Sequence, residues 1–238
     1  MSRSYRKNSL GPAMSRGELI GGFFYLPVYL LALTLILSLV LDWIAPSYTD
    51  AQFNAVFYIV NFLVMAAIFH RFLIASLRAL MERFWPAVQA VILGYVLYWV
   101  VDWLAAVALS LLNPSTVNPN QAAVNTLLQT DFYLFAACTV LLAPLVEELF
   151  FRGLFFSNLY PKSRILAYTV SVVCFSLLHI YNYIGVAAWR DLLFSFLAYV
   201  PPSIALAWTY ERAGTIWAPI LLHAFINFVN CGLLGALL

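Results

Sequence analysis

The sequence is poor in charge. Only 9% of its 238 residues are Asp, Glu, Lys or Arg, whereas 64% are hydrophobic. A soluble domain usually carries about 25% charged residues, so this composition excludes an ordinary globular enzyme. The net charge of +2 is too small to favour nucleic acid as a partner, and no run of like charges indicates a disordered tail.

Cysteine is also scarce. The chain has three cysteines, Cys138, Cys174 and Cys231, and each stands in an apolar segment. An odd number of cysteines in such segments predicts neither a disulfide framework nor a cysteine metal site. We interpret all three as small packing residues.

Long hydrophobic runs dominate the sequence instead. Several exceed the roughly 18 residues that cross a bilayer, so we predict an all-α integral membrane protein, a polytopic bundle of about seven transmembrane helices. The predicted helices are residues 19–42, 52–70, 86–112, 131–160, 164–183, 190–210 and 215–237. The first run is too long for the core of a cleavable signal and has no clear cleavage site, so we expect it to be a helix.

The connection between the second and third predicted helices has a helical pattern of its own. Its sequence, RFLIASLRALMERF, places Arg71 and Arg78 seven residues apart among apolar residues. That pattern is typical of a short helix lying in the membrane interface, or of a frayed extension of the second helix. We divide the chain into residues 1–85, with the basic tail, two helices and this segment, and residues 86–238, a bundle that carries the motifs.

Basic residues gather on one side of the predicted helices. Ten of the twelve Lys and Arg residues lie in the N-terminal segment and in the loops after the second, fourth and sixth helices: Arg3, Arg6, Lys7, Arg16, Arg71, Arg78, Arg83, Lys162, Arg164 and Arg212. Of the Lys and Arg residues, only Arg190 lies in the loops on the opposite side. The positive-inside rule therefore predicts a cytoplasmic N-terminus and a C-terminus outside.

A few ionisable side chains fall inside the predicted helices, where each by default marks a functional site, a proton path or a buried pair. They are Asp102, Glu147, Glu148, Arg152, His179 and His223, with Asn227 as a neutral companion. Glu148 and Arg152 are four residues apart, so they share a helix face and can neutralise each other. Glu147 is turned about 100° from that face, which favours a free carboxylate suited to general-base work over a second packing ion pair. Pro144, one turn earlier, is expected to open the helix to water.

Two further units repeat the spacing of four residues. Phe175 and His179 stand near the end of the fifth predicted helix, and His223 and Asn227 stand in the seventh. A lone histidine in a helix is more often a packed core residue, but two in one membrane bundle favour a site. Helix rise places Glu147, His179 and His223 roughly 20, 25 and 14 Å from the same end, so we expect one cavity reached from the cytoplasm.

The three units together resemble the signature of the CPBP (CAAX protease and bacteriocin-processing, or Abi) family of membrane proteases, which includes the type II CAAX prenyl endopeptidases. The family pattern is E-E-x-x-x-R, F-x-x-x-H and H-x-x-x-N or H-x-x-x-D. Here it stands as Glu147-Glu148-Leu-Phe-Phe-Arg152, Phe175-Ser-Leu-Leu-His179 and His223-Ala-Phe-Ile-Asn227, in the family's order and in separate helices. The resemblance covers about residues 86–238.

The resemblance implies roles for these residues in an intramembrane endopeptidase. Glu147 and His179 would activate the attacking water, and His223 and Asn227 would stabilise the oxyanion. The remaining motif residues, Glu148, Arg152 and Phe175, would support the site. No cofactor is required, and we favour metal-independent water activation over a zinc site formed by Glu147, His179 and His223.

Other functions fit the sequence less well. The chain has no H-E-x-x-H, G-x-G-D or G-x-S-G motif, which excludes the other membrane-protease classes. The alternatives are a proton-coupled transporter, for which paired broken helices are missing, and a non-catalytic immunity or scaffold protein of the same fold.

Two features lie outside the motifs. Asp102 is interpreted first as a hydrogen-bonding link between helices and second as part of an access path. Pro201 and Pro202 are expected to kink the sixth helix, either as a static kink or beside a substrate groove.

The substrate class stays open at this stage. The resemblance permits a prenylated C-terminal peptide, a peptide precursor or a membrane protein as the substrate partner, with the lipid bilayer around it. The compact chain favours a prokaryotic plasma membrane.

Overall fold

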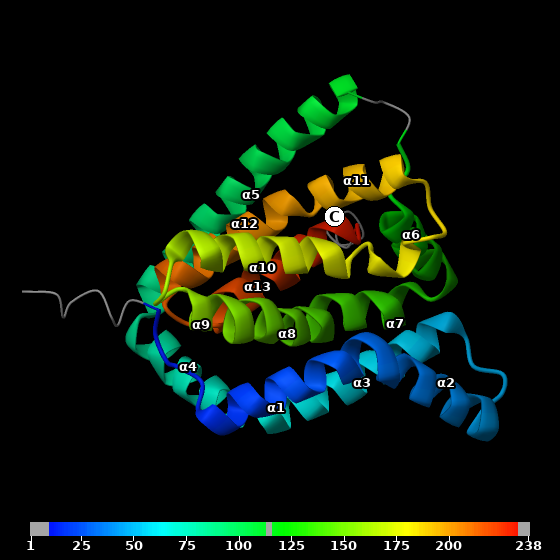
Figure 1. The fold of residues 1–238 in the computed structure, drawn as a ribbon, viewed down its shortest axis with the longest axis horizontal. Coiled ribbons are helices and arrows are strands. Elements are labelled where there is room, and N and C mark those ends of the chain that lie inside the picture. The colour runs from blue at the N-terminus through cyan, green and yellow to red at the C-terminus, as the bar shows by residue number, and fades with distance from the viewer. Residues whose placement is uncertain (1–9, 113–115, 233–238) are drawn as a thin grey trace, which may run out of the picture.

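The computed structural model describes residues 10–112 and 116–232. Within these ranges every regular element is a helix, and the helices form one bundle (Figure 1). The α-helices are α1 (Arg16–Pro27), α2 (Leu33–Ile44), α3 (Asp50–Ile68), α4 (His70–Glu82), α5 (Phe84–Leu112), α6 (Pro119–Thr130), α7 (Phe132–Ala137), α8 (Ala143–Glu148), α9 (Ser157–Leu159), α10 (Arg164–Leu178), α11 (Trp189–Ala198), α12 (Val200–Ala213) and α13 (Trp217–Asn230). Three π-helical segments, η1 (Val28–Ala32), η2 (Cys138–Leu142) and η3 (Leu149–Phe156), and a 3₁₀ turn, η4 (Tyr181–Tyr183), complete the list.

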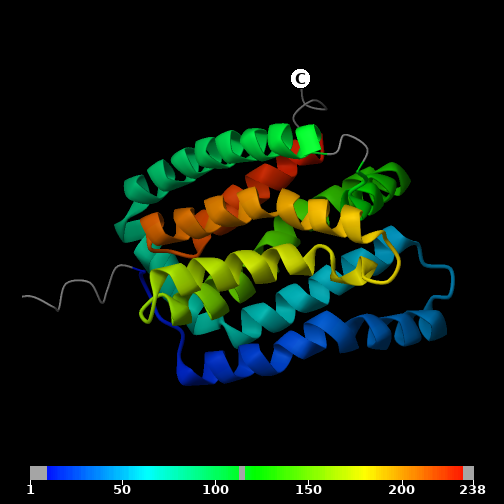
Figure 2. The same cartoon turned by 45° about the horizontal axis from the view of Figure 1, so that its top comes forward.

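The predicted class, a membrane-embedded helical bundle, is confirmed. Five helical segments of the described chain are long and apolar enough to cross a bilayer: Arg16–Ile44, Asp50–Ile68, Phe84–Leu112, Phe132–Leu159 and Trp189–Ala213. Two other predicted spans correspond to shorter apolar helices, Arg164–Leu178 and Trp217–Asn230, which lie alongside them (Figure 2). The chain is therefore a multi-pass membrane protein, and the number seven stays a prediction.

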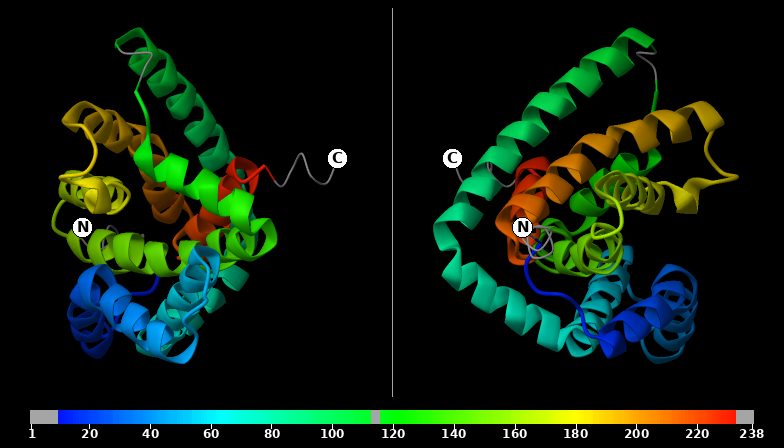
Figure 3. Two further views of the ribbon diagram at one scale, coloured as in Figure 1. Left: turned by 90° about the vertical axis from the view of Figure 1, so that its right-hand side faces the viewer. Right: turned by 60° about the vertical axis from the view of Figure 1, so that its left-hand side comes forward.

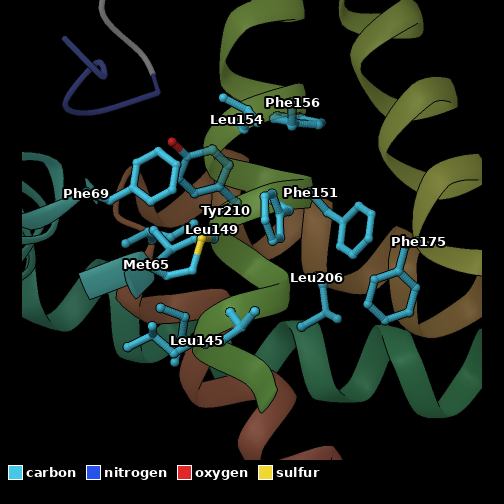
Figure 4. Close-up of a cluster of buried hydrophobic side chains, with 14 of the residues drawn as sticks. Met65, Phe69, Leu145, Leu149, Phe151, Leu154, Phe156, Phe175, Leu206 and Tyr210 are labelled. Atoms are coloured by element: carbon cyan, nitrogen blue, oxygen red, sulfur yellow. The ribbon is translucent and has the colours of Figure 1, made fainter. Parts of the chain in front are cut away.

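The segment Phe132–Leu159 runs through the centre of the bundle and is its most buried span. It is continuous from α7 to α9, but η2 and η3 widen two of its turns. Pro144 is the second residue of α8, which directly follows η2 within this continuous helical segment. Its own side chains, such as Leu149 and Phe156, form one core cluster with Tyr210 of α12 (Figure 4). A central, well-packed helix of this kind gives the motif residues a rigid support.

The interfacial segment is a helix distinct from α3. Phe69 interrupts the helix between α3 and α4, with φ −102° and ψ 19°, and α4 continues in a new direction (Figure 3). The buried carboxylate of Glu18 accepts a hydrogen bond of 2.7 Å from the Phe72 N–H near this corner. Because the start of an α-helix leaves backbone N–H groups unpaired, Glu18 satisfies one of them and ties α1 to α4.

Helix α5 is tightly packed at one end only. A Cβ on Gly94 would lie 2.0 Å from Thr209 Oγ1 and 2.9 Å from Leu222 Cδ2, so only glycine allows α5 to approach α12 and α13 this closely. Further along, Trp103, Leu111 and other side chains are exposed, and α5 diverges from α12 (Figure 1). The divergence leaves Asp102 beside a cavity rather than in a packed interface.

The double proline divides the sixth predicted helix into two. Helix α11 ends at Ala198, α12 begins at Val200, and Pro201 and Pro202 occupy the first turn of α12. Proline is tolerated there because the N–H groups of a first turn have no partner within the helix. The expected interruption is thus present as a break between two helices, and Pro202 faces the same cavity as Asp102.

Candidate active site

Three helices bring the central carboxylate and the two histidines together. Glu147 lies in the last turn of α8, His179 follows the last residue of α10, and His223 lies in the middle of α13. Glu147 Oε2 is 3.9 Å from His179 Nε2 and 3.9 Å from His223 Nε2. Glu147 and His223 are buried. The predicted convergence of these three side chains is therefore present.

The other ring nitrogen of each histidine is held by an acceptor. His179 Nδ1 lies 2.8 Å from the carbonyl oxygen of Phe175, and His223 Nδ1 lies 2.9 Å from Glu148 Oε1. A carbonyl accepts hydrogen bonds, as does an ionised carboxylate, so each Nδ1 carries the proton that it donates. In a neutral ring, Nε2 then keeps its lone pair, and in both rings Nε2 points to Glu147.

Glu148 is the centre of a buried network. Its Oε1 accepts a 2.9 Å hydrogen bond from Arg152 Nη1, which forms the ion pair that the spacing of four residues predicts. Both side chains are fully buried. Arg152 Nη2 also donates to the carbonyl oxygen and the hydroxyl of Ser203, at 2.8 and 2.9 Å. Because His223 donates to the same Glu148 oxygen, this network joins α8, η3, α12 and α13 beneath the site.

Phe175 packs against both the network and the histidines. The Arg152 guanidinium lies over its ring at 4.8 Å from the centroid. The rings of His179 and His223 lie 4.6 and 5.7 Å from it. A phenylalanine in this place both favours the cation and excludes water from the ion pair.

Asn227 lies beside the histidines but one of its amide N–H groups is already used. Its Nδ2 donates a 2.9 Å hydrogen bond to the carbonyl oxygen of Thr139. Thr139 belongs to η2, so this bond joins α13 to the π-helical part of the central segment. The second N–H of the amide group can still donate to a ligand.

Tyr199 is a neighbour of the site that the motifs do not include. Its ring stacks on His179, with centroids 4.1 Å apart and planes 23° apart. Asn120 Nδ2 donates a 2.7 Å hydrogen bond to its hydroxyl. The sequence offers one hint, because Tyr199 lies two residues before Pro201, at the break between α11 and α12.

Two cavities meet at these residues. The first has a volume of about 430 Å³ and is bounded by the start of α3, by α6 and by residues 181–183, with Glu147 in its wall. The second, of about 360 Å³, lies between α5, α6, α12 and α13 and includes Asp102. His179, His223 and Asn227 line both cavities, so the histidine pair stands where they join.

Both cavities lie toward one end of the bundle. Their walls come from the helix ends near Asn54, Asn118, Tyr183 and Asn230. The opposite end, which we call the basic end, consists of the segments around Arg16, α4, residues 160–164 and Arg212, and none of these lines either cavity. Figure 1 shows α4 and α9 at one end and α6 at the other.

The position of the cavities corrects the prediction that the N-terminus and the opening of the cavity lie on the same side of the membrane. The N-terminus and ten of the twelve Lys and Arg residues are expected on the cytoplasmic side, and the cavity is expected to open there too. Since α1 begins at the basic end and the cavities lie at the other, a cytoplasmic N-terminus and a cytoplasmic opening are incompatible. Residue counts predict how far Glu147, His179 and His223 lie along their helices. They do not show at which end of the bundle the cavity opens.

The sequence also leaves open a zinc site formed by the central carboxylate and the two histidines. Among the described residues, no three His, Cys, Asp or Glu side chains are grouped closely enough to hold a metal ion. The three candidate ligands, Glu147, His179 and His223, provide a chemically suitable His₂Glu donor set. The carboxylate oxygen lies 3.9 Å from each Nε2 atom, a wider spacing than the roughly 3.3 Å between ligand atoms of tetrahedral zinc.

The structure also bears on the interpretation of Asp102 as a hydrogen-bonding link between helices. No hydrogen bond or ion pair joins Asp102 to another described residue, so a partner for such a link is missing there.

Comparisons with known proteins agree with the motif pattern. Residues 129–229 match the family described as type II CAAX prenyl endopeptidase Rce1-like. The UPF0177 protein YbdI of Lactococcus lactis subsp. lactis, a protein of a CPBP-type family, is 29% identical over 142 residues, which are 58% of this chain and 70% of that protein. No solved structure matches the chain. The predicted resemblance is thus confirmed: residues 129–229, which match the Rce1-like family, include every motif residue.

Proposed function

We propose that this protein is an intramembrane endopeptidase in which Glu147 and His179 activate a water molecule. The observation that carries the proposal is the position of Glu147 Oε2, 3.9 Å from the Nε2 atoms of both histidines. This separation is too long for a direct hydrogen bond but is readily bridged by one water molecule. Glu147 Oε2 has no hydrogen-bond partner among the described residues, so its lone pairs are available to a substrate water.

In the proposed reaction, Glu147 accepts a proton from the attacking water, and His179 accepts a hydrogen bond from it. The water oxygen bonds to the peptide carbonyl carbon while its proton passes to Glu147 and the carbonyl π electrons move to oxygen. The lone pair of His179 Nε2 accepts the second hydrogen bond and fixes the direction of attack. The C–N bond then breaks, and Glu147 returns its proton to the leaving amine.

The oxyanion requires N–H donors, and the site offers two. Asn227 has one amide N–H that Thr139 does not use. His223 already donates Nδ1–H to Glu148, so its Nε2 can donate only when the ring is an imidazolium. Arg152 and Glu148 balance each other, and an imidazolium at His223 would balance an ionised Glu147. The buried cluster would then be neutral overall, which limits the cost of desolvation.

Chelation tests the choice between water activation by side chains alone and a zinc mechanism. We expect purified protein to cut peptides in a proteome-derived pool equally well with and without 1,10-phenanthroline, measured by mass spectrometry of new peptide ends. Loss of cutting with the chelator and recovery with zinc would replace the proposed mechanism by a metal one, with Glu147, His179 and His223 as ligands. If wild-type protein cuts no peptide in the pool, the endopeptidase proposal is contradicted for soluble substrates.

The charge distribution supports a cytoplasmic N-terminus, and we propose a bacterial or archaeal plasma membrane because the relative is bacterial. In that orientation the cavities open on the outer side. We expect a cysteine at Val186, which is 85% exposed near the cavity end, to react with an impermeant maleimide on intact cells. A cysteine at Lys162, on the basic end, should react only after lysis. Both are placed in a chain without Cys138, Cys174 and Cys231, and the reverse labelling pattern would contradict the proposed orientation.

The alternatives are less well supported by the cavities. A proton-coupled transporter must expose its site to both sides in turn, and neither cavity is lined by residues of the basic end. A non-catalytic protein of the same fold would have no need of an unpaired carboxylate between two histidines. The same peptide pool distinguishes both alternatives from an endopeptidase.

A further inference from the structure

The second cavity contains a carboxylate that the proposed reaction does not use. Asp102 is partly buried on α5 and lines this cavity together with Tyr98, one turn earlier. The amide side chains of Asn118, Gln121 and Asn230 also line it. Since His179 and His223 form part of the same wall, a chain bound at the site can extend directly to Asp102.

Among the described residues, Asp102 has no Lys or Arg partner to neutralise it. No Lys or Arg lines either cavity, and no ion pair joins Asp102 to another described residue. The nearest buried cation along the site, Arg152, is paired with Glu148 and lies behind Phe175. A carboxylate in a partly dehydrated cavity is costly unless a positive charge or several donors approach it. The two cavities therefore favour a cationic occupant and disfavour a free carboxylate.

The distance between Asp102 and the histidines follows from helix packing. The rings of Tyr95 and Phe225 are 4.8 Å apart, which places these residues of α5 and α13 at similar heights. Both helices run from the basic end to the cavity end, so Asp102 lies about nine residues, or roughly 13 Å, beyond the level of His223. An extended peptide covers that distance in about four residues.

We propose that Asp102 is a substrate-binding residue that selects a Lys or Arg side chain about three to five residues from the peptide bond that is cut. This inference rests on the proposed endopeptidase function and narrows its substrate class to peptides with a basic residue near the cleaved bond. The ammonium or guanidinium group would bond the Asp102 carboxylate, and the neighbouring amides would accept its remaining hydrogen bonds. A substrate with its free C-terminal carboxylate in this cavity is disfavoured, because no Lys or Arg is among the described residues that line it.

The cleavage profile of wild-type protein, Asp102→Asn and Asp42→Asn tests this assignment. Asp42 is an exposed acid near the cavity end that lines neither cavity, so its variant is a matched control. We expect Lys and Arg to be enriched about tenfold at one position three to five residues from the cut bond, for wild type and Asp42→Asn. In Asp102→Asn the enrichment should fall to about one. No enrichment in wild type, or the same enrichment in Asp102→Asn, would overturn the proposal.

A binding measurement separates this proposal from the proposed reaction. Two acetylated and amidated octapeptides, identical except for Lys or norleucine at one position, are titrated into Glu147→Gln protein in dodecyl maltoside. We expect the Lys peptide to bind about tenfold more tightly, and the difference to vanish in the Glu147→Gln, Asp102→Asn double variant. Lys preference without any cleavage by wild type would keep the subsite and contradict the endopeptidase. Equal binding of both peptides would contradict the subsite whether or not cleavage occurs.

Discussion

Replacing Glu147 by glutamine is expected to reduce the rate of peptide cleavage by a factor of about 10² to 10⁴ while leaving the fold intact. The carboxamide nearly preserves the shape of the side chain but cannot take the proton of the attacking water. The wild-type carboxylate has no hydrogen-bond partner at Oε2 among the described residues. The substitution therefore removes no hydrogen bond at this oxygen, and the unfolding temperature should change little.

The measurement pairs turnover of one peptide from the cleaved pool with thermal unfolding in the same detergent. Glu82→Gln is a suitable control, since Glu82 is an exposed acid on α4 at the basic end. A slow and well-folded Glu147→Gln protein is the expected result. A variant that is slow only because it unfolds would remove the argument for a catalytic role.

Replacing Arg152 by methionine is expected to destabilise the protein by about 3–5 kcal/mol, because it leaves a charged partner buried and uncompensated. Arg152 and Glu148 are both fully buried and 2.9 Å apart. The guanidinium also donates to the carbonyl oxygen and the hydroxyl of Ser203. Activity should fall with stability, since Glu148 also holds the ring of His223.

A double variant separates the stability of the network from its role in the site. In Glu148→Gln, Arg152→Met, the two charges disappear together, and the glutamine oxygen can still accept from His223 Nδ1. We expect this protein to be more stable than Arg152→Met alone, as measured by unfolding in detergent in a double-mutant cycle. If the double variant were less stable than wild type by the sum of the two single-variant effects, the ion pair would not be the reason for the loss.

Much of this fold was predictable because membrane helices are specified by length and apolarity. The run 86–112 was expected as a helix and α5 extends from Phe84 to Leu112. The ion pair between Glu148 and Arg152 was predictable for the same local reason, since residues four apart share a helix face. The meeting of Glu147, His179 and His223 required a resemblance as well, because spacing within helices does not fix how they pack.

The features that were missed depend on contacts between distant segments. The bond from His223 to Glu148 joins residues 75 positions apart, and that from Asn227 to Thr139 joins residues 88 apart. No periodicity within a helix predicts either contact. The π turn that contains Thr139 has no simple sequence signal, and the end of the bundle at which the cavities lie follows only from how the helix ends are arranged.

The most direct test of the central claim, peptide hydrolysis that depends on Glu147, is a comparison of wild-type and Glu147→Gln proteins incubated with the same peptide pool. Mass spectrometry identifies every new peptide end. The account predicts a defined set of new ends with wild type and none above background with Glu147→Gln. The same ends produced at a similar rate by Glu147→Gln would contradict the account.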